Sequence, residues 1–467
     1  MSQLATLAPD IIMAFGGTLV LLLGTRRSDK AVNDFLRWLS VIIIGGAALA
    51  LAYTRPNSLP AAEGWIISSS INIVFGVIFL AILAWTVLAA KAPEHAAGEW
   101  HALLIYAGNG MLILARSGSL AALFLGIEIL SLSLYVLISF FCHRGMALRG
   151  GTMYLVLAAF ASAFLVFGLA LVYASFGTLD LAELAQRVSS KGLFHAPMAM
   201  LGFGLFIVGV GFKLAAVPFH MWAADVYEAS PGPVAGLIAS ASKGAVIAAF
   251  IPFLFLVNTH GDILWLISAA SMIVGNLMGL LELRVKRILA YSSIAHIGYI
   301  LVGYLAGYNG VGITGVGAMI FYVVAYALAI AGAFTALSFI ERDHELGVRD
   351  LRGVARVSPA LAFCILVFII SLAGIPPAIG FFGKLYLFSA GVSAGYIWLP
   401  VLGLLGSAIG VYYYLRIIVN LYMTPGENPN LKISYTPLQI SIIIATAAAI
   451  VFFGCFPQTM ITALKLF

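Results

Sequence analysis

Charged residues are scarce in this chain. Asp, Glu, Lys and Arg make up 9% of its 467 residues, whereas hydrophobic residues make up 63%. About a quarter of the residues of an average soluble domain are charged, so an ordinary soluble domain is excluded. No polar stretch is long enough to fold as a separate soluble domain. Apolar runs of roughly 20 residues follow one another instead, which predicts an all-α, polytopic membrane protein.

Cysteines and cofactor-binding motifs are also lacking. The three cysteines, Cys142, Cys364 and Cys455, are scattered and show neither metal-site spacing nor a disulfide framework. The sequence contains no P-loop, no dinucleotide-binding glycine motif and no pair of haem ligands. We therefore expect no metal, cofactor or redox chemistry in this chain. The net charge of +6 reflects basic loops of a membrane protein, so no nucleic-acid partner is expected.

The apolar runs predict about fourteen transmembrane helices. They cover residues 8–24, 36–53, 70–90, 101–115, 119–140, 150–174, 198–219, 232–257, 262–281, 287–306, 312–340, 359–390, 396–423 and 437–456. Basic residues follow the first run and do not precede it, so it is expected to be a retained helix and not a cleaved signal peptide. The seventh and twelfth runs contain Pro218 and the pair Pro376 and Pro377, so both are expected to be broken.

The distribution of basic residues predicts the orientation. With the N-terminus outside, fifteen basic residues fall in inside loops: Arg26, Arg27, Lys30, Arg37, Lys91, Arg144, Arg149, Arg284, Lys286, Arg287, Arg342, Arg349, Arg352, Arg356 and Lys432. Five fall outside: Arg55, Arg116, Arg187, Lys191 and Lys465. Inside loops of membrane proteins carry the excess of basic residues, so both termini are expected on the outer, periplasmic side.

A few charged residues lie inside the predicted helices. Arg416 is close enough to a helix end to extend its side chain to the interface. Lys213, Lys243 and Lys384 lie too deep for that, and Glu128 is the one acid near mid-depth. Such a charge costs about 3 kcal/mol at the bilayer centre, so it needs a partner, water or a function.

Glu128 and Lys213 are predicted to work as a pair. A lysine removed from water binds its proton less tightly, and a nearby carboxylate strengthens the binding again. Movement or neutralisation of Glu128 would therefore control whether Lys213 is protonated. The alternative for Glu128 is a static ion pair that orients two helices, and the alternative for Lys213 is a lysine that only caps the broken helix. For Lys243, which follows the small residues Gly236, Ala239 and Ser240, the alternative is a role in helix packing.

A weak internal repeat connects the two halves. GFK (211–213) near Pro218 resembles GFFGK (380–384) after the proline pair, and SLSLY (131–135) resembles SIAHIGY (293–299). The odd number of helices per unit predicts two inverted five-helix repeats, residues 96–260 and 261–425. Residues 1–95 would form three further helices, and residues 426–467 would hold the last. His296 is a candidate proton relay, because histidine titrates near neutral pH, and His220 is expected to support the first break.

The two longest of these motifs point to a family. GFKLAAVPFHMWAADVYEASPGPVAG and SLAGIPPAIGFFGKLYLF resemble the antiporter-like membrane subunits of respiratory complex I, and Lys384 is similar to the N-type subunits. The resemblance covers nearly the whole chain. WAADVYEASPGP departs from the usual family pattern in three places, so the roles of Asp225 and Glu228 stay open.

The resemblance implies a proton-translocating subunit of an NADH:quinone oxidoreductase, a translocase in the bacterial inner membrane. It implies that Glu128 and Lys213 are the regulatory pair, that Lys243 is the central relay and that Lys384 is the exit lysine. It further implies partner membrane-arm subunits, quinone as a substrate of the whole complex, and FMN and iron–sulfur clusters in other subunits.

Two alternatives remain at this point. The chain could belong to a cation/proton antiporter complex or to a ferredoxin-driven relative. It could also be a structural membrane subunit, in which case lysine variants would fail to assemble.

Overall fold

The computed structural model describes residues 2–25, 30–54, 57–61, 64–140, 145–191, 196–310, 313–340, 345–425 and 433–464. Cys142 and seven of the predicted loop cations lie outside these ranges: Arg26, Arg27, Arg55, Arg144, Arg342, Lys432 and Lys465.

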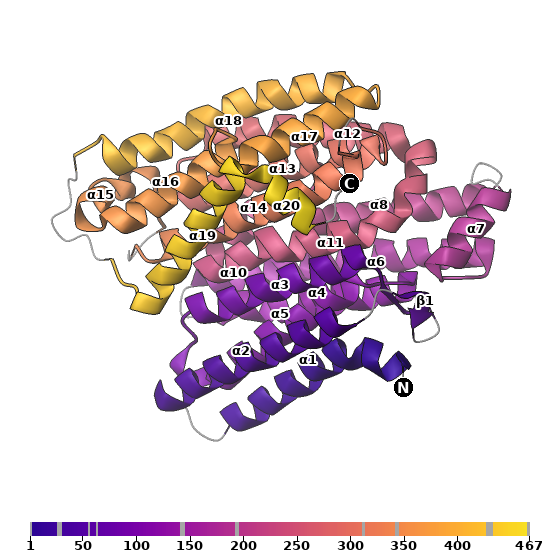
Figure 1. Cartoon of the computed structure of the whole chain (residues 1–467), viewed down its shortest axis with the longest axis horizontal. Helices are drawn as coiled ribbons and strands as arrows, with labels where there is room; N and C mark the ends of the chain where they lie inside the picture. Colours follow the sequence, from indigo (N-terminus) through magenta and orange to yellow (C-terminus); the bar gives the residue numbers. More distant parts are fainter. Residues whose placement is uncertain are drawn as a thin grey trace. The chain divides into compact units, whose positions relative to one another are not determined.

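The described residues are mainly helical (Figure 1). The first helices are α1 (Ser2–Gly24), α2 (Lys30–Tyr53), α3 (Ser70–Ala89), α4 (Ala97–Ala115), α5 (Leu120–Ser139), α6 (Gly145–Phe176), α7 (Leu181–Lys191), α8 (Pro197–Leu214), α9 (Ala223–Ala229), α10 (Gly232–Leu237), α11 (Lys243–Phe250) and α12 (Val257–Leu281). They are followed by α13 (Val285–Ala306), α14 (Gly315–Ser338), α15 (Val354–Val357), α16 (Pro359–Ala373), α17 (Ile379–Ser393), α18 (Trp398–Tyr422), α19 (Pro437–Cys455) and α20 (Pro457–Ala463). Strands β1 (Asn57–Ala61) and β2 (Ile66–Ser68) pair antiparallel in a short hairpin.

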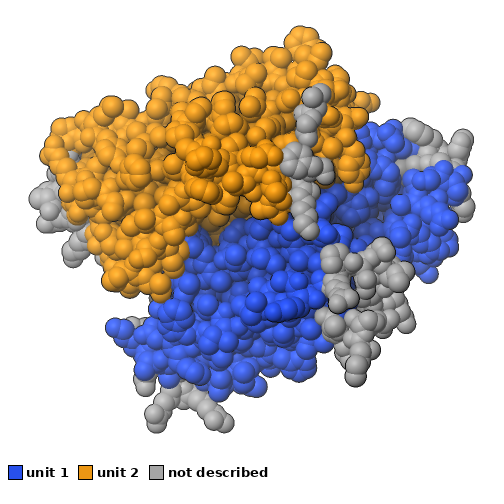
Figure 2. Space-filling view, viewed as in Figure 1, with its two compact units in different colours: residues 1–214, 241–260 blue, residues 215–240, 261–467 orange. Residues whose placement is uncertain are grey.

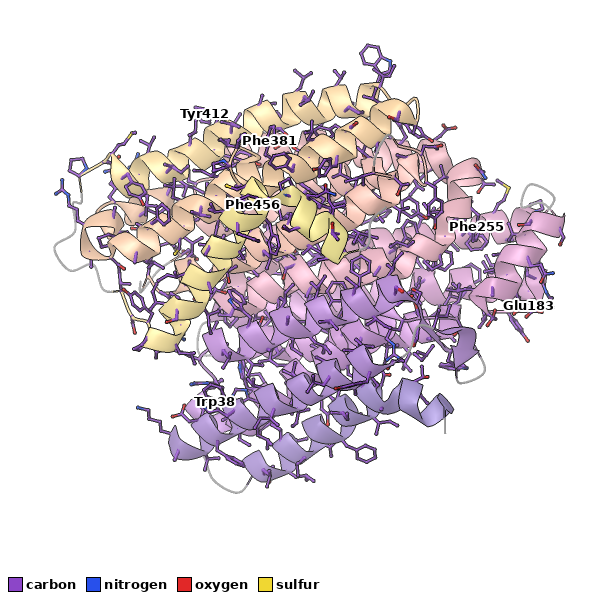
Figure 3. All side chains as sticks on the ribbon, viewed as in Figure 1. Trp38, Glu183, Phe255, Phe381, Tyr412 and Phe456 are labelled. Atoms are coloured by element: carbon purple, nitrogen blue, oxygen red, sulfur yellow. The ribbon has the colours of Figure 1, made fainter. Side chains whose placement is uncertain are left out.

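These helices confirm an all-α, polytopic membrane fold. Within the described residues, eleven helical stretches are long and apolar enough to cross a membrane. One of them, Gly232–Leu281, covers two predicted spans, because the 3₁₀ segment Ile251–Leu256 connects α11 directly to α12. Large side chains such as Trp38 and Tyr412 project outward, with 51% and 62% of their surface exposed (Figure 3). Exposed apolar side chains of this kind suit contact with lipid or with other membrane helices.

The chain divides into two compact units (Figure 2). Unit 1 contains residues 1–214 and 241–260, and unit 2 contains residues 215–240 and 261–467. The predicted division into four parts at residues 95, 260 and 425 remains a prediction.

Close packing of α6 against α8 positions one end of unit 1. A Cβ on Gly168 would lie 2.6 Å from the carbonyl oxygen of Gly202, and a Cβ on Gly202 would lie 2.8 Å from that of Gly168. Only glycine permits this approach, as in other tightly packed membrane helices. Lys213 occupies the last turn of α8, so this contact fixes the helix that carries it.

Helices α13 and α14 form the centre of unit 2, where nearly all of their residues are buried. They pack on each other and on α17, and α9 packs along α13. Because α13 carries His296, this arrangement places the histidine inside the unit.

Both predicted helix breaks are present. Helix α8 ends at Leu214, and the next residue, Ala215, has a φ of 56°. Helix α16 ends at Ala373, and Gly374 follows with a φ of 78°. A left-handed residue ends a helix because the backbone then turns away from the helix axis. In both breaks a cis proline, Pro218 or Pro377, comes three residues after the left-handed one.

Candidate functional site: buried lysines and their partners

Lys213 lies in an aromatic environment in unit 1. Its residue surface is 7% exposed, and its Nζ lies 5.5 Å from the ring centroid of Tyr135 and 5.1 Å from that of Tyr154. The Nζ forms no hydrogen bond with any described residue. The aromatic faces attract the lysine when it is a cation but do not accept its proton, so they hold the amine without binding the proton themselves.

Glu128 is the acid that acts on this lysine. The carboxylate, on α5, accepts a hydrogen bond from the Ser162 hydroxyl of α6, and its charge acts on the Lys213 ammonium. Among the described residues no ion-pair contact within 4.0 Å joins Glu128 to Lys213. Ser162 and Lys213 line the same small hollow between α5, α6 and α8. Glu128 therefore acts on Lys213 without an ion-pair contact within 4.0 Å between the two described side chains.

Lys243 is buried at the start of α11, also in unit 1, with 1% of its surface exposed. A π-helical segment, Ile238–Ser242, precedes it directly. Such segments add a residue to the helical turn and often occur at functional sites. The α-helical spacing that placed Gly236 on the same face as Lys243 therefore does not hold through this segment.

Lys384 lies in unit 2 and binds the end of a helix. Its Nζ donates hydrogen bonds to the carbonyl oxygens of Leu372, at 3.2 Å, and Ala373, at 2.9 Å. The same Nζ lies 5.2 Å from the ring centroid of Tyr299. The last carbonyls of a helix lack intrahelical partners and carry partial negative charge, so a lysine amine suits them.

Lys213 and Lys384 lie at related sites, although their positions in the sequence relative to the helix break differ. Lys213 precedes its break, whereas Lys384 follows its break in α17, in the order that the two motifs have in the sequence. The Lys384 amine nevertheless reaches back to the end of α16, as Lys213 lies at the end of α8. Each lysine also lies over a tyrosine from one of the matched motifs, Tyr135 or Tyr299.

His296 is the centre of a hydroxyl-rich cluster in unit 2. It is 3% exposed, and the Tyr322 hydroxyl lies 2.6 Å from its Nδ1. The Tyr414 hydroxyl lies 3.3 Å from its Nε2 and also bonds the hydroxyl of Ser292. With a hydroxyl at each ring nitrogen, His296 has partners that can donate or accept as its protonation changes.

His220 lies in the first break, after Pro218. Burial lowers the pKa of His220 below its ordinary value, although a hydrogen bond with the backbone of Pro218 opposes this shift. A neutral histidine bonded to the break fits a supporting role.

The connection after the first break is fixed by the start of α13. Arg284 binds Glu228 at 3.0 Å, and Arg287 binds Asp225 and lies 3.5 Å from Glu228. Arg287 also binds Glu282 at 2.8 Å. The sequence left Asp225 and Glu228 unassigned, and these contacts give both a structural partner.

Burial also affects how Glu228 titrates. It raises the pKa of Glu228 above its ordinary value of 4.5, and the pairing with Arg284 and Arg287 offsets only part of the rise. The folded chain then holds this proton more tightly than the unfolded chain does. The contribution of Glu228 to stability is therefore lost as pH rises from the ordinary value through the raised one.

The sequence did not identify the aromatic and hydroxyl partners. Ser162, Tyr154, Tyr322 and Tyr414 come from helices distant in sequence, and nothing local marks them. Tyr135 and Tyr299 could have been found, because both lie in the matched motifs. Arg416 is half-buried and donates to the carbonyl oxygens of Leu280, at 3.4 Å, and Glu282, so its side chain bonds the end of α12.

No cluster of three or more His, Cys, Asp or Glu side chains with metal-ligand geometry occurs in the described ranges. Of the cysteines within them, Cys364 is buried and Cys455 is exposed, and both are free thiols. The arrangement of buried lysines, a glutamate, a histidine and hydroxyls is suited to proton transfer.

Comparison with known proteins agrees with this chemistry. A family model described as NADH:quinone oxidoreductase/Mrp antiporter, TM, matches residues 117–410. NADH-quinone oxidoreductase subunit N of Trichlorobacter lovleyi is 35% identical over 461 residues, which are 96% of this chain and 94% of that protein. This chain belongs to the subunit N family of NADH-quinone oxidoreductase.

Solved structures also share the fold of this chain. A chain of respiratory complex I from Thermus thermophilus with bound aureothin matches with a TM-score of 0.85 and 32% identity, over 98% of this chain and 99% of that one. A chain of the Mrp complex from Dietzia matches with a TM-score of 0.81 over 100% and 96%, but at 19% identity it shows a shared fold alone. The family resemblance inferred from the two motifs is confirmed.

Proposed function

We propose that this chain transfers protons across the membrane as a subunit of an NADH:quinone oxidoreductase. Glu128, Lys213, Lys243, His296 and Lys384 bind and release the proton, driven by quinone reduction elsewhere in the complex. The observation that supports this most strongly is the environment of Lys213. Its buried amine has no hydrogen-bond partner among the described residues, and Glu128 is close enough to act on it without contact.

The pair works as a switch in this proposal. When Glu128 is ionised and near, it stabilises protonated Lys213. When Glu128 moves away or is neutralised, the buried ammonium loses that stabilisation and releases its proton. Ser162, which donates to Glu128, holds the carboxylate in one of these positions.

The later steps of proton transfer are inferred from the sequence and from the surroundings of each lysine. Lys243 accepts the proton from Lys213, and His296 passes it towards Lys384, the exit lysine. The bonds of Lys384 to the end of α16 keep its amine at a defined point until it is displaced.

We infer the setting from the family and the orientation of the termini from the basic loops. The chain assembles with other membrane-arm subunits in the bacterial inner membrane, surrounded by lipid, with both termini on the periplasmic side. Quinone is a substrate of the whole complex, and FMN and iron–sulfur clusters belong to partner subunits.

The test is proton pumping by the assembled complex in liposomes. Lys213→Ala and Glu128→Ala are each expected to lower the number of protons moved per quinone reduced. Lys30→Ala is the control, because Lys30 is exposed at the start of α2, and it should leave that number unchanged. If both site variants keep the wild-type ratio, the proposal is wrong.

The same variants separate the alternatives. A purely structural role predicts that the lysine variants fail to assemble, whereas proton transfer predicts assembled complexes that pump poorly. Membership of a cation/proton antiporter complex predicts purification without peripheral iron–sulfur subunits.

A further inference from the structure

The proposed function leaves open how a proton reaches His296. Helix α9, in the connection after the first break, packs along α13 within unit 2. It directs two neighbouring side chains at α13. Glu228 binds Arg284 just before the start of α13, and Tyr227 lies deeper, with its hydroxyl facing Ser293.

Tyr227 is fixed in this position. It is fully buried, and its ring packs edge-to-face on Trp222 at 6.0 Å and on Phe334 at 5.6 Å between centroids. An apolar aromatic would fill this space equally well, so the buried hydroxyl requires a polar reason. Ser293, one turn before His296 on α13, lies close enough to act on the Tyr227 hydroxyl.

Tyr326 connects this pair to the histidine. Its ring lies over His296, with 4.8 Å between centroids, and its hydroxyl is close to those of Ser293, Tyr227 and Tyr414. The Tyr326 hydroxyl is buried, and it forms no hydrogen bond of normal geometry with the described residues. A buried polar atom in that state is the kind of group that internal water binds.

The remaining step to the histidine is short. The Tyr414 hydroxyl lies 3.3 Å from His296 Nε2. Hydroxyl groups both donate and accept, so a file of them can pass a proton by accepting on one side and donating on the other. The file runs from Tyr227 through Ser293, Tyr326 and Tyr414 to His296.

We propose that Tyr227, Ser293 and Tyr326 form the route by which a proton reaches His296, and that Glu228 collects the proton at the outer end of this route. This inference rests on the proposed function. Glu228 is 7% exposed and faces Arg284, Arg287 and Glu345, so it lies in a charged cluster at the surface end of α9. Burial raises the pKa of Glu228, which supports the role because the carboxyl then binds a proton more readily.

Four variants of the whole complex in liposomes test the route. Tyr326→Phe and Tyr227→Phe keep the ring packing and remove one hydroxyl each. We expect the pumping rate to fall about tenfold in each variant, because the route loses one of its hydroxyls; this fall corresponds to about 1.4 kcal/mol in the transfer step. Glu228→Gln should slow pumping likewise. Asp225→Asn is its matched control, because Asp225 also binds Arg287 but its side chain is 49% exposed.

A further control is Tyr304→Phe. It removes a buried hydroxyl from α13, the helix that carries His296, about 12 Å farther along the helix from that histidine. It should leave pumping unchanged. Wild-type pumping in Tyr326→Phe and Tyr227→Phe, with impaired pumping in His296→Ala, would overturn the route and leave the proposed function standing. Wild-type pumping in His296→Ala and Lys213→Ala as well would overturn both. If Tyr326→Phe does not assemble, Tyr227→Phe decides by the same criterion.

Discussion

Gly374 sets the position of Lys384, and its substitution gives a sharp prediction. Gly374 has a φ of 78°, and a Cβ added to it would lie 2.8 Å from Lys384 Cδ and 3.1 Å from its Nζ. Carbon atoms in contact normally stay about 3.5–4.0 Å apart, so the lysine must move in Gly374→Ala. The moved amine would lose its hydrogen bonds to Leu372 and Ala373.

The expected loss of stability in Gly374→Ala has two parts. A side chain in the left-handed conformation costs roughly 1–2 kcal/mol. Loss of the bonds made by the charged amine adds about 1.5–3 kcal/mol, for a total of about 2.5–5 kcal/mol. Gly395 is the matched control: it has a φ of 88°, but a Cβ there would meet no atom within 4 Å. Gly395→Ala should therefore lose only the roughly 1–2 kcal/mol that comes from the left-handed conformation.

Heat inactivation of the assembled complex measures the stability difference, and proton uptake by liposomes measures pumping per quinone reduced. Gly395→Ala should pump normally, whereas Gly374→Ala should pump poorly even at temperatures where its complex stays assembled. If Gly374→Ala and Gly395→Ala move the same number of protons per quinone reduced, the position of the Lys384 amine does not matter for pumping, and the reasoning is refuted.

Three further predictions follow from single contacts. Ser162→Ala removes the donor to Glu128 and should lower the pumping rate about fivefold to tenfold, from a loss of about 1–1.4 kcal/mol, with unchanged amounts of assembled complex on native gels. Tyr299→Leu removes the ring over Lys384 and should weaken pumping, whereas Tyr299→Phe keeps that ring and should retain most of it in the same liposome assay. Glu228→Gln removes a group whose raised pKa makes stability fall as pH rises above its ordinary value of 4.5. The heat-inactivation temperature of the variant should therefore depend less on pH above 4.5 than that of the wild type, and an unchanged slope would contradict this.

Much of the fold could be predicted because the bilayer imposes strong constraints. Residues 8–24 and 437–456 are simple apolar runs, and both correspond to single helices, α1 and α19. The breaks near Pro218 and Pro377 followed from the effect of proline on a helix. The 3₁₀ connection between α11 and α12 was missed although Pro252 lies at its start, because residues 244–257 are apolar and include no charged or polar residue that would mark a turn.

The site was predictable in its titrating residues and not in their partners. A buried lysine is conspicuous in an apolar sequence, so Lys213, Lys243 and Lys384 could be found. The direction of a long side chain is not encoded locally, and for that reason the return of Lys384 to the end of α16 could not be foreseen. The tyrosines around His296 looked like ordinary membrane aromatics, since their hydroxyls meet only after α13, α14 and α18 pack.

The most direct test of the account is the ratio of protons moved to quinone reduced, measured in one liposome preparation for Lys213→Ala, Lys243→Ala and Lys384→Ala complexes. If these lysines carry the proton, all three complexes assemble and each shows a lower ratio than the wild type. Assembled complexes with the wild-type ratio in all three variants would contradict the account.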